Sequence, residues 1–182
     1  MFDLIIGSAI LHHLVDPFAA LVNITSSLKP GGKIVLIEPM EAGCLLLTII
    51  YERVLEFFQK RGEITHKIAN LMRAMRTDIH ARLGVPQQHD WTKYLDDKWV
   101  FNRVYLAQLT EKLGLSIVQV FPNQLNLTHV YEESFRSLLS DTGNTGIQIP
   151  EEVFEIFREF DEGIHPDLKE WLCPTGIILI TK

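Results

Sequence analysis

The stretch FDLIIGSAILHHLVDPFAALVNITSSLKPGGKIVLIEP, residues 2–39, decides the fold of this chain. Residues 2–7 form an apolar run without alternation, which is typical of a strand buried on both faces. Asp16 suits a helix cap and Pro17 a first helical position, so a helix is expected to follow until the Lys-Pro-Gly-Gly sequence ends it. Residues 33–39 are a second apolar strand. Strand, helix and strand with short links predict a right-handed βαβ unit.

The composition sets limits on the class of protein. The chain has 182 residues, a formal net charge of −6 and 47% apolar residues, which together predict one globular domain without disorder. The acidic balance argues against nucleic-acid binding through bulk charge. Residues 44–51, the longest apolar run, are far shorter than the roughly 20 residues of a membrane span. With two cysteines and no basic leader, we expect a soluble, cytoplasmic protein without a disulfide framework.

Four short motifs occur in a fixed order along residues 2–39. They are FD at 2–3, LHH at 11–13, DP at 16–17 and LKPGG at 28–32. In this order and spacing the segment resembles the fourth strand, its helix and the fifth strand of the class I S-adenosylmethionine-dependent methyltransferases. The resemblance implies an α/β fold with a partial Rossmann-like sheet, holding strands four to seven of that family.

The glycine-rich cofactor loop of that family is absent from this sequence, as is any GxGxxG or GxxxxGK[ST] pattern. The resemblance places that loop before the fourth strand, so residues 1–182 are expected to be a single incomplete, truncated methyltransferase domain. The strand at residues 2–7 would then be an exposed sheet edge. We expect the chain to self-associate through this edge.

The rest of the chain alternates helices and strands. Residues 41–59 and 66–83 have helical apolar spacing, and residues 40–99 are expected to form an inserted helical lid over the carboxyl ends of the strands, where ligands of open α/β sheets bind. Further helices are expected at 101–113 and around 150–162, and strands at 115–122 and 175–181. The resemblance makes residues 175–181 an antiparallel strand inserted between its neighbours at 33–39 and 115–122.

Several residues are candidates for chemistry. By resemblance, Ser8, Ala9 and Ile10 lie against the cofactor, largely through their backbone; a simple strand-to-helix loop is the alternative. His13 is assigned to the cofactor side and is also a candidate general base, or it makes a structural hydrogen bond. Glu38 ends the second strand, where its carboxylate would accept a proton, orient a substrate or cap the next helix.

The substrate candidates come from the expected lid. Arg73 and Arg76 share one helix face and would bind an anionic group, or they are a solvated face. Tyr51 would line an apolar pocket or belong to the core. No metal site is expected, because the adjacent histidines His12 and His13 should point in different directions.

The resemblance implies methyl transfer from S-adenosylmethionine, the expected cofactor, to an O, N or C nucleophile of a small molecule, with an acceptor of apolar character. The alternative is a non-catalytic fragment or interaction module that pairs with a partner through its open sheet edge. A third interpretation, another α/β enzyme such as a reductase, would require a glycine-rich nucleotide loop, which this sequence lacks.

Overall fold

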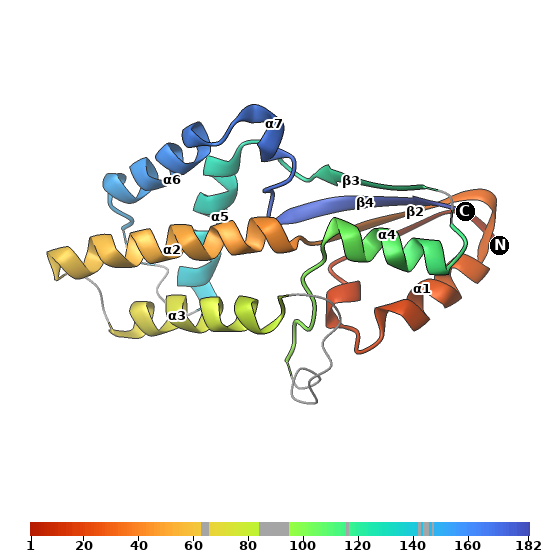
Figure 1. The fold of residues 1–182 in the computed structure, drawn as a ribbon. Helices are drawn as coiled ribbons and strands as arrows, with labels where there is room; N and C mark the ends of the chain where they lie inside the picture. The colour runs from red at the N-terminus through yellow and green to blue at the C-terminus, as the bar shows by residue number, and fades with distance from the viewer. Residues whose placement is uncertain (63–65, 84–94, 116, 142, 144–145, 147) are drawn as a thin grey trace.

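The computed structural model describes residues 1–62, 66–83, 95–115, 117–141, 143, 146 and 148–182 (Figure 1). The elements follow in the order β1 (Phe2–Ser8), the 3-10 turn η1 (Leu11–His13), α1 (Pro17–Ser26), β2 (Leu28–Pro39), α2 (Glu41–Arg61), α3 (His66–Ala81), α4 (Arg103–Lys112), β3 (Ile117–Pro122), α5 (Leu127–Asp141), α6 (Glu151–Gly163), α7 (Pro166–Lys169) and β4 (Thr175–Thr181).

The four strands form one open mixed sheet in the order β1-β2-β4-β3. β1 and β2 run parallel, and β4 is antiparallel to both of its neighbours. The expected βαβ unit is present, and Asp16 caps α1 by accepting a hydrogen bond from the N–H of Ala19 at 2.9 Å. The expectation that the last strand is antiparallel and inserted between the second and third strands is confirmed.

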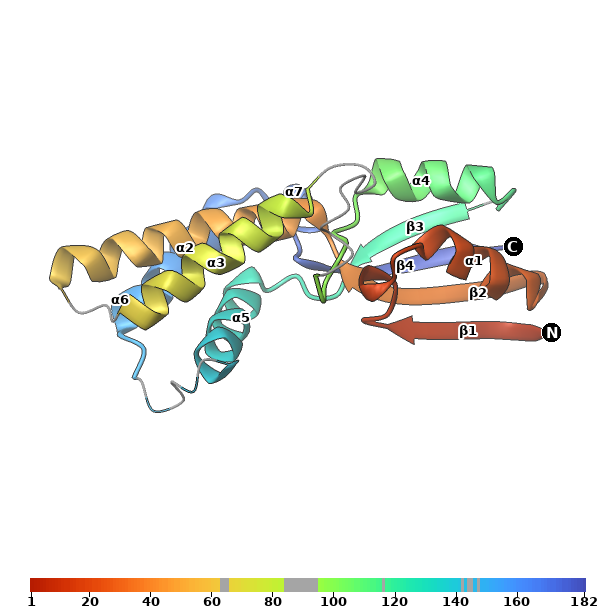
Figure 2. The same cartoon turned by 90° about the horizontal axis from the view of Figure 1, so that it is seen from below.

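Helices α1 and α4 lie on the same face of the sheet (Figures 1 and 2). Under them the strand side chains of Ile34 and Ile180 are fully buried, as the apolar character of these strands predicts. The opposite face is more open: Ile6 is 65% exposed and its neighbour Val35 is half-buried. β1 is therefore an edge strand with an exposed face, as expected for residues 2–7, because among the described elements β2 alone pairs with it. The burial on both faces that is typical of such an apolar run is not reached, since helices cover one side.

The segment 28–32 differs from its expected role as a helix-to-strand turn. These residues belong to β2, which starts at Leu28 and contains an irregularity in its pairing with β1. Gly31 has a φ of 76°, which favours glycine, and its N–H donates to the carbonyl of Lys182 at 3.1 Å. The glycine therefore lets the strand bend while the backbone stays paired.

The remaining helices form a second layer of structure beyond the carboxyl ends of β2 and β3 (Figure 1). The expected lid helices are present as α2 and α3, but they share their core with α5 and α6. Aromatic rings connect α2 to α5 and α6. The ring centroid of Phe135 on α5 lies 6.0 Å from that of Tyr51 on α2 and 6.0 Å from that of Phe157 on α6. The helical layer is thus built from two stretches of sequence rather than from residues 40–99 alone.

Gly43 fixes where this layer meets the sheet. A Cβ atom at Gly43 would lie 2.2 Å from the backbone carbon of Cys173, so only glycine permits this contact between α2 and the segment before β4. Residues 84–94 of the expected lid lie outside the described residues. Within the described part of the chain, no helix has the length and apolar character that crossing a membrane requires.

Candidate functional site

The turn after β1 lies at the carboxyl edge of the parallel pair. Ser8, Ala9 and Ile10 are all exposed there, and the N–H of Ala9 donates to the carbonyl of Ile37 at 2.9 Å. Ala9 has a φ of 54°, which is uncommon for a residue other than glycine and costs backbone energy. Strain of this kind concentrates at functional turns, and the predicted cofactor-side residues coincide with it.

Glu38 holds this turn from behind. It is 1% exposed at the end of β2, and its Oε1 accepts hydrogen bonds from the N–H groups of Ile10 at 3.1 Å and Leu11 at 2.8 Å. Its Oε2 accepts from the N–H of His12 at 3.3 Å and lies 2.6 Å from Nδ1 of the same residue. The carboxylate therefore satisfies the first N–H groups of the 3-10 turn, as an anion at a helix N-terminus does.

These hydrogen bonds set the protonation state of Glu38. Burial raises the pKa of the carboxyl, but the hydrogen bonds from His12, Leu11 and Ile10 outweigh it and leave the pKa below its ordinary value. Glu38 is thus a buried carboxylate whose two oxygens are already engaged. In this geometry it is a positioning residue, with its oxygens turned to the protein and away from solvent.

His12 is the residue that links Glu38 to the surface. Its Nε2 lies 3.4 Å from Oδ1 of Asp97, and Nδ1 of His13 lies 3.3 Å from the same oxygen. The two imidazole rings have centroids 4.1 Å apart, so the adjacent histidines come closer together than the sequence analysis assumed. The nitrogens of both histidines and an oxygen of Asp97 lie within 4.8 Å of one another, which makes them potential metal ligands.

Backbone hydrogen bonds hold Asp97 in place. The N–H groups of Lys98 and Trp99 both donate to the carbonyl of His12, at 2.6 Å and 3.2 Å. The indole N–H of Trp99 donates to the carbonyl of Leu14 at 2.7 Å. Arg82, which is 6% exposed, approaches Oδ2 of Asp97 at 3.5 Å. The segment carrying Asp97 is therefore docked on the turn that carries both histidines.

The sequence analysis did not single out Asp97 or Arg82 as site residues. The available signal was weak: an acidic pair precedes a tryptophan at residues 96–99, in a segment without periodicity. His12 was noticed only as the neighbour of His13, although it is the buried member of the pair at 7% exposure.

The predicted substrate residues lie elsewhere. Tyr51 is buried in the helical core, where desolvation raises its pKa above the ordinary value. Arg73 is exposed on α3 and donates to Asn70 at 3.4 Å, while Arg76 forms an exposed ion pair with Glu52 of α2. The described contacts do not bring any of these three to Glu38 or His13.

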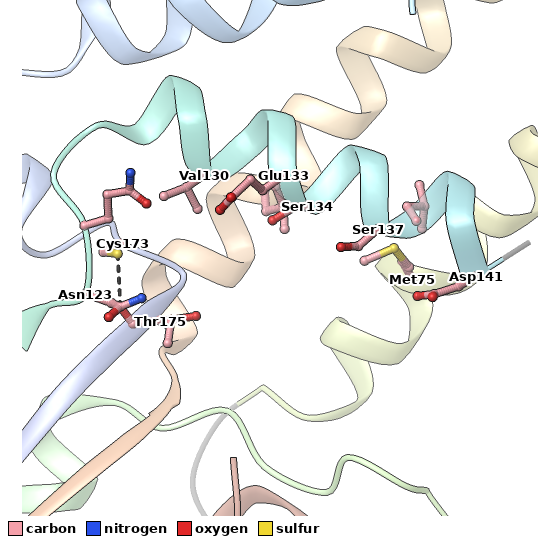
Figure 3. Close-up of a pocket in the computed structure, with 12 residues that line it drawn as sticks. Met75, Asn123, Val130, Glu133, Ser134, Ser137, Asp141, Cys173 and Thr175 are labelled. Carbon is pink, nitrogen blue, oxygen red and sulfur yellow. Dashed lines mark hydrogen bonds between the residues drawn. The ribbon is translucent and has the colours of Figure 1, made fainter. Parts of the chain in front are cut away.

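A cavity of about 390 Å³ lies between α3, α5 and the segment leading into β4 (Figure 3). Its wall includes the carboxylates of Glu133 and Asp141, but no lysine or arginine of the described residues. On the sheet side, Sγ of Cys173 donates to the carbonyl of Thr175 at 3.0 Å. None of the predicted substrate residues lines this cavity, which the sequence analysis did not anticipate.

The arrangement provides two chemical elements near the carboxyl edge of the sheet. One is a strained, exposed turn held by a buried carboxylate, and the other is a histidine pair facing Asp97. His13 has a side chain 39% exposed and can reach a bound molecule, whereas the side chain of His12 is 9% exposed.

Comparisons with protein-family models and with curated proteins find no match for this chain.

Proposed function

We propose that the chain forms part of an S-adenosylmethionine-dependent methyltransferase that acts on a small molecule. The observation that carries the proposal is the strand order, in which a parallel β1–α1–β2 unit is followed by β4 inserted antiparallel between β2 and β3. The resemblance implies this order, with residues 175–181 inserted between their neighbours at 33–39 and 115–122.

The residues present offer one wall of a cofactor site. Ser8 and Ile10 are exposed beside the strained Ala9, at the sheet edge where ligands of open α/β sheets bind. The sequence contains no glycine-rich loop. In this proposal the turn is the side of the cofactor site that the fourth strand of the family provides, and residues 1–182 supply no glycine-rich loop for the rest.

S-adenosylmethionine supplies a methyl group already activated on its sulfonium, so the protein's contribution is to position the acceptor and exclude water. Glu38 orders the turn, and His13 is the group placed to accept a proton from an O or N acceptor.

The test is ultraviolet crosslinking of isotopically labelled S-adenosylmethionine to the protein, followed by peptide mapping. The protein used is this chain extended by any residues that its gene encodes upstream. We expect label on the peptide that contains residues 8–13 and competition by S-adenosylhomocysteine. Label confined to other peptides, or no displaceable label, would overturn the proposal.

One observation favours a second function. β1 carries exposed apolar side chains at Phe2, Leu4 and Ile6, and among the described strands it pairs with β2 alone. An edge strand of this composition is suited to pair with another polypeptide. In this interpretation the chain is an interaction module, and it would form a defined complex without binding S-adenosylmethionine.

A further inference from the structure

We propose that His12, His13 and Asp97 form a binding site for one divalent transition-metal ion of the zinc class. One nitrogen of each histidine and one oxygen of Asp97 lie within 4.8 Å of one another. Nε2 of His12 and Nδ1 of His13 are the nitrogens that face Oδ1 of Asp97, and we take these three as the ligand atoms. The site goes beyond the proposed methyl transfer and does not depend on it. It replaces the proton-accepting role proposed for His13, because an imidazole that binds the ion through Nδ1 and carries hydrogen on Nε2 has no free lone pair.

The two separations from Asp97 to the histidine nitrogens match a tetrahedral site. Oδ1 of Asp97 lies 3.4 Å from Nε2 of His12 and 3.3 Å from Nδ1 of His13. Zinc bonds of about 2.0 to 2.1 Å place two tetrahedral ligands about 3.3 to 3.4 Å apart, whereas neighbouring octahedral ligands at that bond length lie about 2.9 Å apart. Two imidazole nitrogens and one carboxylate also suit zinc, cobalt or nickel better than magnesium or calcium.

The proton on His12 is directed away from the ion. The oxygens of Glu38 already accept hydrogen bonds from three backbone N–H groups, and Nδ1 of His12 donates to Oε2 at 2.6 Å. Nε2 of His12 is then the nitrogen that faces Asp97 and is placed to bind a cation. A carboxylate behind a ligating histidine is the usual outer partner of a metal site.

The charge around the cluster also favours a divalent ion. Three carboxylates, from Glu38, Asp78 and Asp97, are ion-paired within the cluster, against the one cation Arg82. Because ligating histidines are neutral, this leaves two negative charges, which one divalent ion balances. The backbone hydrogen bonds from residues 98 and 99 to the carbonyl of His12 hold the ligands in place beforehand, so little ordering is required on binding.

Binding changes one existing contact. Nδ1 of His13 also lies 3.1 Å from the carbonyl oxygen of Asp96, to which it donates when protonated. Ligation requires the hydrogen on Nε2 of His13 instead. A protonated His12 would satisfy Glu38 and Asp97 without a metal, and this is the alternative that the experiment separates from ours.

The experiment is a titration of tag-free, chelator-treated chain with Co²⁺, followed by its visible absorption and then by displacement with Zn²⁺. We expect one equivalent of Co²⁺ to bind with the intense bands of tetrahedral coordination, Zn²⁺ to displace it, and excess Mg²⁺ to have no effect. Asp97→Asn and His13→Gln should each weaken Co²⁺ binding at least tenfold, because each removes one ligand.

Two variants serve as matched controls. Asp96→Asn changes the neighbouring, fully exposed carboxylate, and His129→Gln removes a surface histidine that pairs with Glu133 at 3.2 Å. Both should bind Co²⁺ as the unchanged chain does, and circular dichroism should report the same fold for all four variants. The proposal is overturned if the unchanged chain gives no tetrahedral cobalt spectrum, or if Asp97→Asn and His13→Gln bind Co²⁺ like the controls.

Discussion

Oε2 of Glu38 lies 2.6 Å from Nδ1 of His12, and both residues are buried. This contact joins the end of β2 to the 3-10 turn that follows β1, across 26 positions of sequence. Because Glu38 also accepts hydrogen bonds from the N–H groups of residues 10–12, one carboxylate orders the whole turn at the carboxyl edge of the sheet.

Replacing Glu38 should therefore destabilise the fold. Glu38→Gln removes the charge and presents an amide to N–H donors, so we expect the free energy of unfolding to fall by about 2 to 4 kcal/mol. Urea unfolding followed by circular dichroism measures this. Glu56→Gln, on the exposed pair with Arg53, is the control and should change the value by less than about 0.5 kcal/mol. Equal effects of the two substitutions would contradict the anchoring role.

Arg76 of α3 and Arg82, which directly follows α3, should contribute differently to stability. Arg82 is 6% exposed and pairs with Asp78 and Asp97, whereas Arg76 is exposed in its pair with Glu52. Arg82→Ala leaves carboxylates without their cation and exposes buried apolar surface, so we expect a loss of about 2 to 3 kcal/mol. Arg76→Ala should cost less than about 0.5 kcal/mol in the same unfolding measurement. A similar cost for both would show that burial of Arg82 carries no stability.

Asp161 should make stability depend on pH. Its carboxylate accepts hydrogen bonds from the N–H and hydroxyl of Thr128 at 3.2 and 2.9 Å and pairs with Lys169, so it joins α6 to α5 and the α7 segment. Burial raises the pKa of Asp161, but the hydrogen bonds from Lys169 and Thr128 outweigh it and leave the pKa below the ordinary 3.8. The stability that this group contributes is complete above pH 3.8 and is lost as the pH falls through the folded-state pKa.

Asp161→Asn tests this dependence. We expect it to lower the free energy of unfolding at neutral pH by about 1 to 2 kcal/mol, and the difference from the unchanged chain to shrink as the medium is acidified below pH 3.8. Glu162→Gln, at the exposed adjacent position, should leave the pH profile unchanged. A difference for Asp161→Asn that is independent of pH would contradict the assignment.

The exposed edge of the sheet should drive self-association. Ile6 on the edge strand β1 is 65% exposed. Val104 on helix α4 is 66% exposed and is the matched control, because it is equally exposed but does not lie on a strand. Ile6→Lys should lower the apparent mass of the chain in light scattering at high concentration, because a charge blocks pairing at an edge strand. Val104→Lys should leave the mass unchanged. A monomeric unchanged chain, or equal effects of both substitutions, would argue against this role of β1.

The double substitution of Arg73 and Arg76 to alanine separates two kinds of acceptor. No described contact brings either arginine to the turn of residues 8–13, where the acceptor would meet His13. Methyl transfer should therefore continue at the same rate in the double variant. A large rise in KM for the acceptor would instead indicate an anionic acceptor bound on α3, as the sequence analysis considered.

Local patterns were sufficient to predict most of the fold. Residues 2–39 contain a strand, a capped helix and a strand in direct succession, so short-range signals such as Asp16 and Pro17 determine the outcome. The helix α2 was predicted in the same way, by its apolar spacing. The segment 28–32 was predicted less well, because a turn sequence became part of β2 once pairing with β1 and the chain end was available.

The site was predicted only in part, for a physical reason. The exposed turn at residues 8–10 and Glu38 were identified because they end strands at the same sheet edge. The contact between His12 and Asp97 joins residues 85 positions apart, and the segment that carries Asp97 has no periodicity to locate it. Its position depends on the docking of Trp99, whose indole N–H reaches the carbonyl of Leu14. Tertiary contacts of this kind leave no local pattern in the sequence.

The central claim is that the turn after β1 belongs to a methyltransferase. The most direct measurement is isothermal titration calorimetry of S-adenosylmethionine into this chain and into the chain extended by any residues that its gene encodes upstream. We predict saturable binding by the extended form, with weaker binding or none by residues 1–182 alone, because the glycine-rich loop is absent from them. Absence of binding by both forms would contradict the account and favour an interaction module that uses the edge strand.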